Sequence, residues 1–285
     1  MNASNRAAHL GPVDLVATAV PDLRVVGLQR LALGGKWRVE AMRSYSRPVL
    51  LWFTRGQGRI TVAGTTRGYG PHNAIFLPAG TMHGFDMLGQ VLGSAVFLPN
   101  DALLDWPDEP AHLRIRDVRQ QSELTSLIDS IETEMAKDDA IAMRAALHHA
   151  GLMSVWLART MDNNPTAANA GVDRKAADRI AAAFTSMVEK AFRTAKPIAT
   201  YARELGVTPT HLTRACNATS GRSASNILME RRLYEARKML AETKMPVKSI
   251  ASELGFKTPA YFTRMFHAQT GVTPTQFRNA PARRH

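Results

Sequence analysis

Residues 23–98 alternate short apolar stretches with turn residues, a pattern that predicts β-structure. Glycine-rich turn signals stand at residues 33–36, 55–58, 63–65, 68–71 and 78–80. Strands recurring roughly every 8–12 residues are typical of a sandwich or small barrel. Residues 49–53 and 74–77 are continuous apolar runs, as expected of strands buried on both faces. We therefore expect an N-terminal β-barrel-like domain.

After a proline-containing loop at residues 99–112, the apolar spacing becomes helical. Residues 121–137 and 139–161 each carry apolar side chains three and four positions apart, which predicts two amphipathic helices. We expect them to pack as a hairpin. The hairpin either covers the β-domain or forms a dimer interface, and both roles are compatible.

Residues 161–171 are small and polar, which is typical of a linker between domains. A helix is expected at 173–193, and the pattern stays helical from there on. The predicted organisation is an effector-sensing domain at 1–112, the hairpin at 113–161, a linker at 162–173 and a helical domain at 174–285.

The last third of the chain contains one helix-turn-helix pattern twice, at residues 202–214 and 251–264. Each copy has an alanine four residues before the turn glycine, then Thr-Pro, an apolar residue, Thr-Arg and a closing glycine. Glycine permits positive φ in the turn, and Thr-Pro suits an N-cap followed by the first helical position. Two such units on one chain indicate a protein that reads two neighbouring segments of DNA major groove.

The second helix of each unit places its first turns against base edges. Arg214 and Arg264 are the leading candidates for guanine contacts, because a guanidinium can bind O6 and N7 together; a phosphate contact or an ion pair within the domain is the alternative. Leu212, Phe262 and Phe266 should point into the core. The outward, DNA-contacting positions are Thr210, His211, Thr213, Arg214, Asn217, Lys257, Pro259, Ala260, Thr263, Arg264 and His267.

A helix expected at residues 224–240 separates the two units. If it is rigid, it sets the distance between the readers. Two readers on one face of DNA should lie about one helical turn, ~34 Å, apart. At any other separation the DNA has to bend.

The net charge of +12 lies almost entirely in the half with the repeat. Residues 1–160 carry 16 Lys and Arg against 15 Asp and Glu, whereas residues 161–285 carry 20 against 9. A basic domain attracts phosphate polyanions and releases their counterions on binding. Charge alone also fits a merely soluble basic surface, but together with the repeat it favours nucleic acid.

Residues 174–278 resemble the AraC/XylS-type DNA-binding domain. The resemblance rests on the sequence patterns at 232–240, 250–256, 261–266 and 270–278. It implies seven helices, two recognition helices and an asymmetric site contacted on one face. The first copy departs from the family pattern: Ala215-Cys216 stands where an aromatic residue commonly occurs. Cys216 is expected to be a small buried residue.

Residues 70–83, from Gly70 to His83 with Pro78-Ala-Gly80 between them, resemble the second cupin motif. Residues 23–98 therefore look like the cupin-type sensor domain of this regulator family. Metal-binding cupins also need an earlier His-x-His, and residues 41–47 contain no histidine. We predict no metal and no cofactor, since His83 alone cannot complete a three-ligand site. His83 either bonds to turn backbone or lines a pocket.

A barrel of this size encloses space for one small ligand. Most of the candidate wall residues also fit a plain hydrophobic core, and Arg38, Arg43 and Arg47 either neutralise an anion or are solvated. The layout resembles regulators of aromatic-acid catabolism, which makes an aromatic carboxylate the hypothetical effector. The candidate effector-binding residues are Arg38, Trp52, Phe76, His83 and Phe85, with Trp37 and Phe53 as further wall candidates.

The sequence predicts a multidomain α+β transcription regulator, an activator that responds to a small-molecule effector. Its expected partners are double-stranded DNA, the effector, RNA polymerase and a second copy of itself. We see no catalytic residues, no membrane span and no signal segment at residues 1–12, and the single cysteine suits a cytoplasmic protein. The alternatives are a cupin enzyme with a DNA-binding tail and a constitutive DNA-binder with an inert β-domain.

Overall fold

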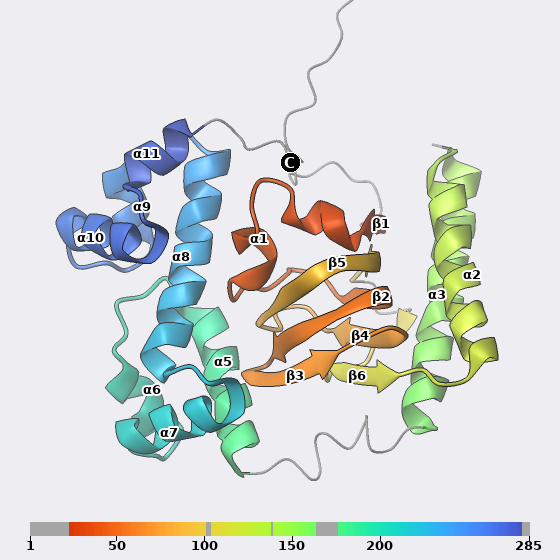
Figure 1. The fold of residues 1–285 in the computed structure, drawn as a ribbon, viewed down its shortest axis with the longest axis horizontal. Helices are drawn as coiled ribbons and strands as arrows, with labels where there is room; N and C mark the ends of the chain where they lie inside the picture. The colour runs from red at the N-terminus through yellow and green to blue at the C-terminus, as the bar shows by residue number, and fades with distance from the viewer. Residues whose placement is uncertain (1–22, 101–103, 138, 164–175, 281–285) are drawn as a thin grey trace, which may run out of the picture.

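The computed structural model describes residues 23–100, 104–137, 139–163 and 176–280. Six strands form one antiparallel sheet in the order β1-β5-β2-β4-β6, with β3 also paired to β2 (Figure 1). Among the described residues the edge strands β1 and β6 do not pair with each other, so the sheet is curved rather than closed by hydrogen bonds. The bounds are β1 (Arg24–Gly27), β2 (Val49–Val62), β3 (Thr65–Tyr69), β4 (Asn73–Leu77), β5 (His83–Phe97) and β6 (Ala111–Arg114).

The two apolar runs of the sequence are the central strands, and each is buried on both faces as predicted. Successive side chains of a strand point to opposite faces, so the runs feed two separate cores. Leu50, Trp52 and Phe76 pack on the face that meets the helical hairpin. Leu51 and Phe53 pack on the other face, which is closed by the short helices η1 (Leu28–Ala32) and α1 (Trp37–Glu40).

The helical hairpin is formed by α2 (Val118–Met135) and α3 (Ala140–Asp162). Each helix begins at an aspartate N-cap, Asp117 or Asp139, whose side chain accepts hydrogen bonds from the first-turn backbone at 2.8 Å. The buried stripe of each helix packs against the sheet. The hairpin therefore covers the β-domain, as one of the two predictions had it (Figure 1). The linker expected at 162–173 lies outside the described residues, except for the last residue of α3 and its C-cap.

Seven helices make up the described C-terminal domain, the number that the family resemblance implied. They are α5 (Ala176–Ala191), α6 (Ile198–Glu204), α7 (Pro209–Ser220), α8 (Ala224–Glu242), α9 (Val247–Glu253), α10 (Pro259–Thr270) and α11 (Pro274–Asn279). The long helix α8 separates the pair α6–α7 from the pair α9–α10 (Figure 1). Its buried face holds Ile227, Leu233, Ala236 and Leu240 against both pairs.

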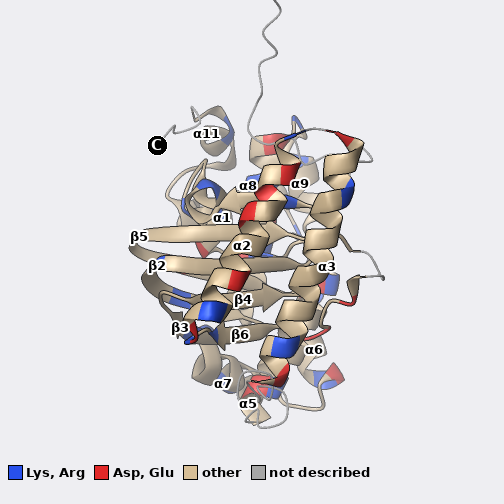
Figure 2. Ribbon diagram, turned by 90° about the vertical axis from the view of Figure 1, so that its right-hand side faces the viewer, with Lys and Arg blue, Asp and Glu red and all other residues tan. Residues whose placement is uncertain are grey.

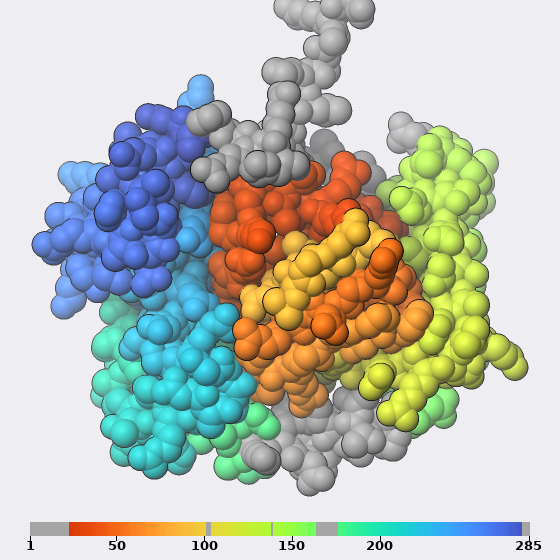
Figure 3. All heavy atoms as spheres, viewed as in Figure 1, coloured from red at the N-terminus to blue at the C-terminus, as the bar shows by residue number. Residues whose placement is uncertain are grey.

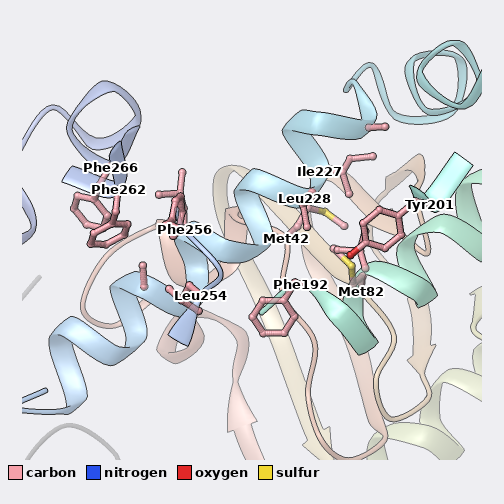
Figure 4. Packing of buried hydrophobic residues seen from close by; sticks show 14 of the residues in the cluster. Met42, Met82, Phe192, Tyr201, Ile227, Leu228, Leu254, Phe256, Phe262 and Phe266 are labelled. Carbon is pink, nitrogen blue, oxygen red and sulfur yellow. The ribbon is translucent and has the colours of Figure 1, made fainter. Parts of the chain in front are cut away.

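The β-domain and the helical domain are in direct contact. Met42 and Met82, both from the β-domain, belong to the same buried cluster as Leu228 and Tyr201 of the helical domain (Figure 4). The space-filling view shows the two halves meeting along a continuous boundary (Figure 3). The β-domain thus contributes two side chains to the hydrophobic core of the helical domain.

Candidate nucleic-acid interface

The two helix-turn-helix units have the local geometry that their sequences predict. Thr208 and Thr258 are N-caps whose hydroxyls accept from the backbone N–H three residues later, both at 3.1 Å. Proline occupies the first helical position of α7 and of α10. Both turn glycines and both closing glycines have φ between 67° and 74°. These short-range devices fix where each second helix starts and stops.

Leu212, Phe262 and Phe266 are fully buried, as predicted. That burial fixes the rotation of α7 and α10 and turns the other faces outward. Thr213 and Thr263 are half-buried. The remaining predicted DNA-contacting residues are all exposed: Thr210, His211, Arg214, Asn217, Lys257, Pro259, Ala260, Arg264 and His267.

Arg214 and Arg264 occupy equivalent exposed positions on the two second helices. Within the described residues neither guanidinium makes a hydrogen bond or an ion pair, so the alternative of an intradomain ion pair finds no support there. Contact with a base edge or with a phosphate stays the prediction for both. Arg203 on α6 and Lys248 on α9 are further exposed cations, on the first helix of each unit; the sequence analysis did not single them out.

Helix α8 sets the separation of the two units. With 19 residues and ~1.5 Å of rise per residue it is about 28 Å long, close to one turn of B-DNA. Arg231 of α8 is buried and binds Glu189 of α5 at 2.7 Å and Glu235 at 3.0 Å. Arg232 donates to the Phe192 carbonyl at 2.7 Å. These contacts fasten α8 to α5, so the two readers are held on a rigid frame at one edge of the molecule (Figure 3).

Cys216 is fully buried on α7, in the core beside Leu212. Burial raises the pKa of its thiol to about 11. A thiol with such a pKa is protonated at neutral pH and a poor nucleophile. Its predicted role as a small buried residue fits this position.

The structure does not bring the five candidate effector residues together. Trp52 and Phe76 pack on the hairpin side of the sheet, whereas Phe85 packs on the opposite side. Arg38 is bound to Glu242 of α8 at 3.1 Å, so this cation is already paired. The five residues therefore do not line one pocket. Successive side chains of a strand point to opposite faces of the sheet, and this places some of the five on one face and some on the other.

His83 lies at the boundary between the domains and is almost completely buried. Its Nδ1 is 2.9 Å from the Thr81 carbonyl, and its ring lies 4.9 Å from that of Tyr45. Burial lowers the pKa of His83 well below its usual value, and the adjacent Arg43 lowers it further. The neutral imidazole thus bonds to turn backbone, which is one of the two predicted roles.

Residues 201–280 match the family described as helix-turn-helix domain. The same region is 30% identical over 81 residues to the arabinose operon regulatory protein of Escherichia coli, covering 28% of this chain and 28% of that protein. It is 37% identical over 81 residues to the probable transcription factor PqrA of Proteus vulgaris, covering 66% of that protein. Residues 201–280 are a helix-turn-helix domain of the AraC/XylS type. The chain spans less than a third of the length of the arabinose regulator that it matches.

Two solved structures were also compared with the whole chain. The AraC/XylS-type domain overlaps the C-terminal domain of AraT from Geobacillus stearothermophilus, with 28% identity, 36% of this chain, 84% of that chain and a TM-score of 0.34. The superposition on ToxT from Vibrio cholerae covers 90% of this chain and 96% of ToxT, with 10% identity and a TM-score of 0.42.

Two further observations concern the described residues. No group of three or more His, Cys, Asp or Glu side chains within them is placed to hold a metal ion. No helix among them combines the length and the apolar character that crossing a membrane requires.

Proposed function

We propose that this protein is a sequence-specific DNA-binding regulator of transcription whose β-domain responds to a small-molecule effector. The observation that carries the proposal is the pair of capped helices α7 and α10. Each has at the same position an exposed arginine that pairs with no residue in the described part of the chain. A protein with two readers joined by a rigid helix binds an asymmetric site in successive major grooves. The excess of positive charge in this half supports binding through phosphates as well.

Effector control requires that a ligand change how the readers meet DNA. Contacts between the β-domain and the first reader offer a route. Thr219 at the end of α7 donates to the Gly64 carbonyl at 2.8 Å, and Arg222 donates to the Thr61 hydroxyl at 3.0 Å. A shift of the β2–β3 turn would be transmitted directly to α7. Activation through RNA polymerase belongs to the same proposal, as does a location in the cytoplasm.

Selection of random duplex DNA by the purified full-length protein tests this function. We expect an enriched asymmetric motif with two blocks about one helical turn apart. Enrichment of a single block would restrict base reading to one unit. If no sequence is enriched, with or without candidate effectors, the proposed function is wrong.

The proposal includes a homodimer formed through α3. Ile141, Leu152 and Val155 are 74%, 57% and 43% exposed. With His148 they form one stripe on the helix surface, at successive spacings of seven, four and three residues. Such a stripe is the pattern of a coiled-coil seam. Acidic residues run along the neighbouring α2, whereas Arg144 and Arg159 lie on α3 (Figure 2). Sedimentation of a Leu152→Glu variant should show monomers where the wild type shows dimers.

A further inference from the structure

A groove lies on the outer face of the sheet, between strand β2 and helix α2. Its volume is about 310 Å³, which is at the lower end of the range for small-molecule sites. This groove is on the hairpin side of the sheet, away from the core that fills the other face. The lining residues are Trp52, Thr54, His72, Gln121, Ser122, Thr125 and Ser126.

Two lining residues carry buried polar atoms without a partner: Nε1 of Trp52 and Nδ1 of His72. Trp52 is only 2% exposed. Leaving a buried indole N–H without an acceptor is unfavourable, so such groups normally find a partner when they are buried. Both atoms belong to residues that line the groove, and the two rings lie 5.9 Å apart.

The backbone of His72 holds its ring at the groove. His72 has φ of 60°, an uncommon conformation for a residue with a Cβ. Its N–H donates to the Phe53 carbonyl at 2.7 Å, and its own carbonyl accepts from Ile115 at 2.9 Å. Bonds on both sides over-determine this conformation, as is typical where a side chain is held for a ligand.

The lining sets the chemistry of the occupant. None of the seven residues is Lys, Arg, Asp or Glu, so a carboxylate would find no cation there. Thr125 donates to the Gln121 carbonyl, and Gln121 Nε2 donates to the Ile115 carbonyl. The oxygens of both side chains remain free to accept, while the indole N–H needs an acceptor. Hydroxyl groups both donate and accept, and the half-buried His72 ring offers an apolar surface.

We propose that the groove between β2 and α2 binds a neutral ring carrying hydroxyl groups, and that this is the effector site of the β-domain. The assignment as effector site rests on the proposed function; the binding itself does not. It replaces the aromatic carboxylate expected from the sequence with a neutral ligand, and of the five expected effector residues it retains only Trp52. The ligand is either a phenolic compound or a sugar, since both are neutral rings that carry hydroxyl groups.

The test is isothermal titration of the full-length protein with salicyl alcohol, methyl glucoside and salicylate, in the absence of DNA. We expect saturable binding of at least one neutral compound, and the one that binds identifies a phenolic or a sugar source. Salicylate differs from salicyl alcohol by its carboxylate and should bind at least about tenfold more weakly. Absence of binding by both neutral compounds, or equal binding of salicylate, would overturn the proposal.

Variants locate the site. Trp52→Phe removes the indole N–H and keeps a ring, and we expect it to weaken binding about three- to tenfold. Trp156→Phe is the matched control, because Trp156 Nε1 is also buried and unpartnered in the same core but does not line the groove. Ser126→Ala lies on exposed surface, cannot disturb the core and should also weaken binding. Unchanged affinity in both Trp52→Phe and Ser126→Ala contradicts the proposal, while DNA selection by the same protein tests the regulator separately.

Discussion

The proposed reading of base edges depends on the two arginines of the second helices. Arg214 and Arg264 match in position, exposure and lack of a partner among the described residues. The flanks differ: Ala215 and Cys216 are buried next to Arg214, whereas Met265 and Phe266 follow Arg264. Both helices are nevertheless fixed in rotation by buried side chains, so each arginine is presented from a rigid surface.

Arg264→Ala should relax base preference at one position of the selected motif and cost about 1–3 kcal/mol of binding to the preferred site. The physical reason is the loss of a bidentate contact with one guanine. Competition binding on a set of single-base variants of the motif measures it.

Lys248→Ala is the matched control for Arg264→Ala, since Lys248 is exposed on the first helix of the same unit. If Lys248 contacts a phosphate, losing that contact should weaken binding to all sequences alike. It should also lower the slope of log affinity against log salt concentration by about one. If Arg264→Ala shows this uniform loss instead, its side chain contacts phosphate.

The buried environment of His112 makes the stability of the protein depend on pH. Burial, with a smaller effect of Arg67, lowers the pKa of His112 from its usual 6.5 to about 4, and its Nε2 is 2.8 Å from Asn73 Oδ1. The unfolded chain binds this proton more readily, so the stabilisation is present above pH 6.5 and is lost as the pH falls towards 4. Between pH 7 and pH 4 the wild type should lose about 2–3 kcal/mol more unfolding free energy than His112→Gln.

Urea denaturation at several pH values measures the unfolding free energy of the wild type and of His112→Gln. Parallel curves for the wild type and His112→Gln would show that His112 does not titrate differently in the folded state.

At the scale of elements, the two turns of the helix-turn-helix units differ in what surrounds them. Both Gly206 and Gly255 have positive φ. A Cβ on Gly206 would meet nothing within 4 Å, but on Gly255 it would lie 2.6 Å from the Thr194 carbonyl carbon. The second turn is therefore packed against the segment between α5 and α6, while the first is open.

Gly206→Ala should cost about 1–2 kcal/mol, which is the penalty for a Cβ at positive φ. Gly255→Ala should cost about 1–3 kcal/mol more, since the backbone of the neighbouring segment has to move. Chemical denaturation of the two variants compares them directly. Equal losses of stability would mean that the packing at Thr194 yields without cost.

Local rules made most of the elements predictable from the sequence. Thr-Pro caps and turn glycines act within a few residues, and so do the continuous apolar runs of β2 and β4. The side of the sheet on which an aromatic residue packs depends on strand alternation and curvature together, so Trp52 and Phe85 could not be separated beforehand. Arg38 pairs with Glu242, 204 residues away, and no local pattern carries such a contact.

At the scale of the whole molecule, α1 joins the β-domain to the far end of the helical domain. The Trp37 ring lies 5.5 Å from that of Tyr234 on α8 and 6.0 Å from that of Phe277 on α11. Arg237 lies over the same indole at 5.8 Å. The β-domain thus contacts the first unit through α7, and it contacts α8 and α11, which pack beside the second unit.

Trp37→Ala should loosen this joint and destabilise the protein by about 1–3 kcal/mol, because two aromatic contacts and their buried surface are lost. In calorimetry the single unfolding transition expected of a shared core should separate into two. Trp106→Ala is the control, since Trp106 stacks on Phe76 within the β-domain and its loss should not uncouple the halves. One unsplit transition for Trp37→Ala would show that α1 does not join them.

The positions of Met42 and Met82 affect any attempt to separate the two domains. Because these two side chains complete the hydrophobic core around Leu228 and Tyr201, the readers cut free at residue 174 would leave apolar surface bare where the methionines sit. Grafting them onto a different sensor would require matching side chains at those two places. The sequence pattern divides the chain into two separate modules, but the helical domain buries its core completely only with side chains from the β-domain.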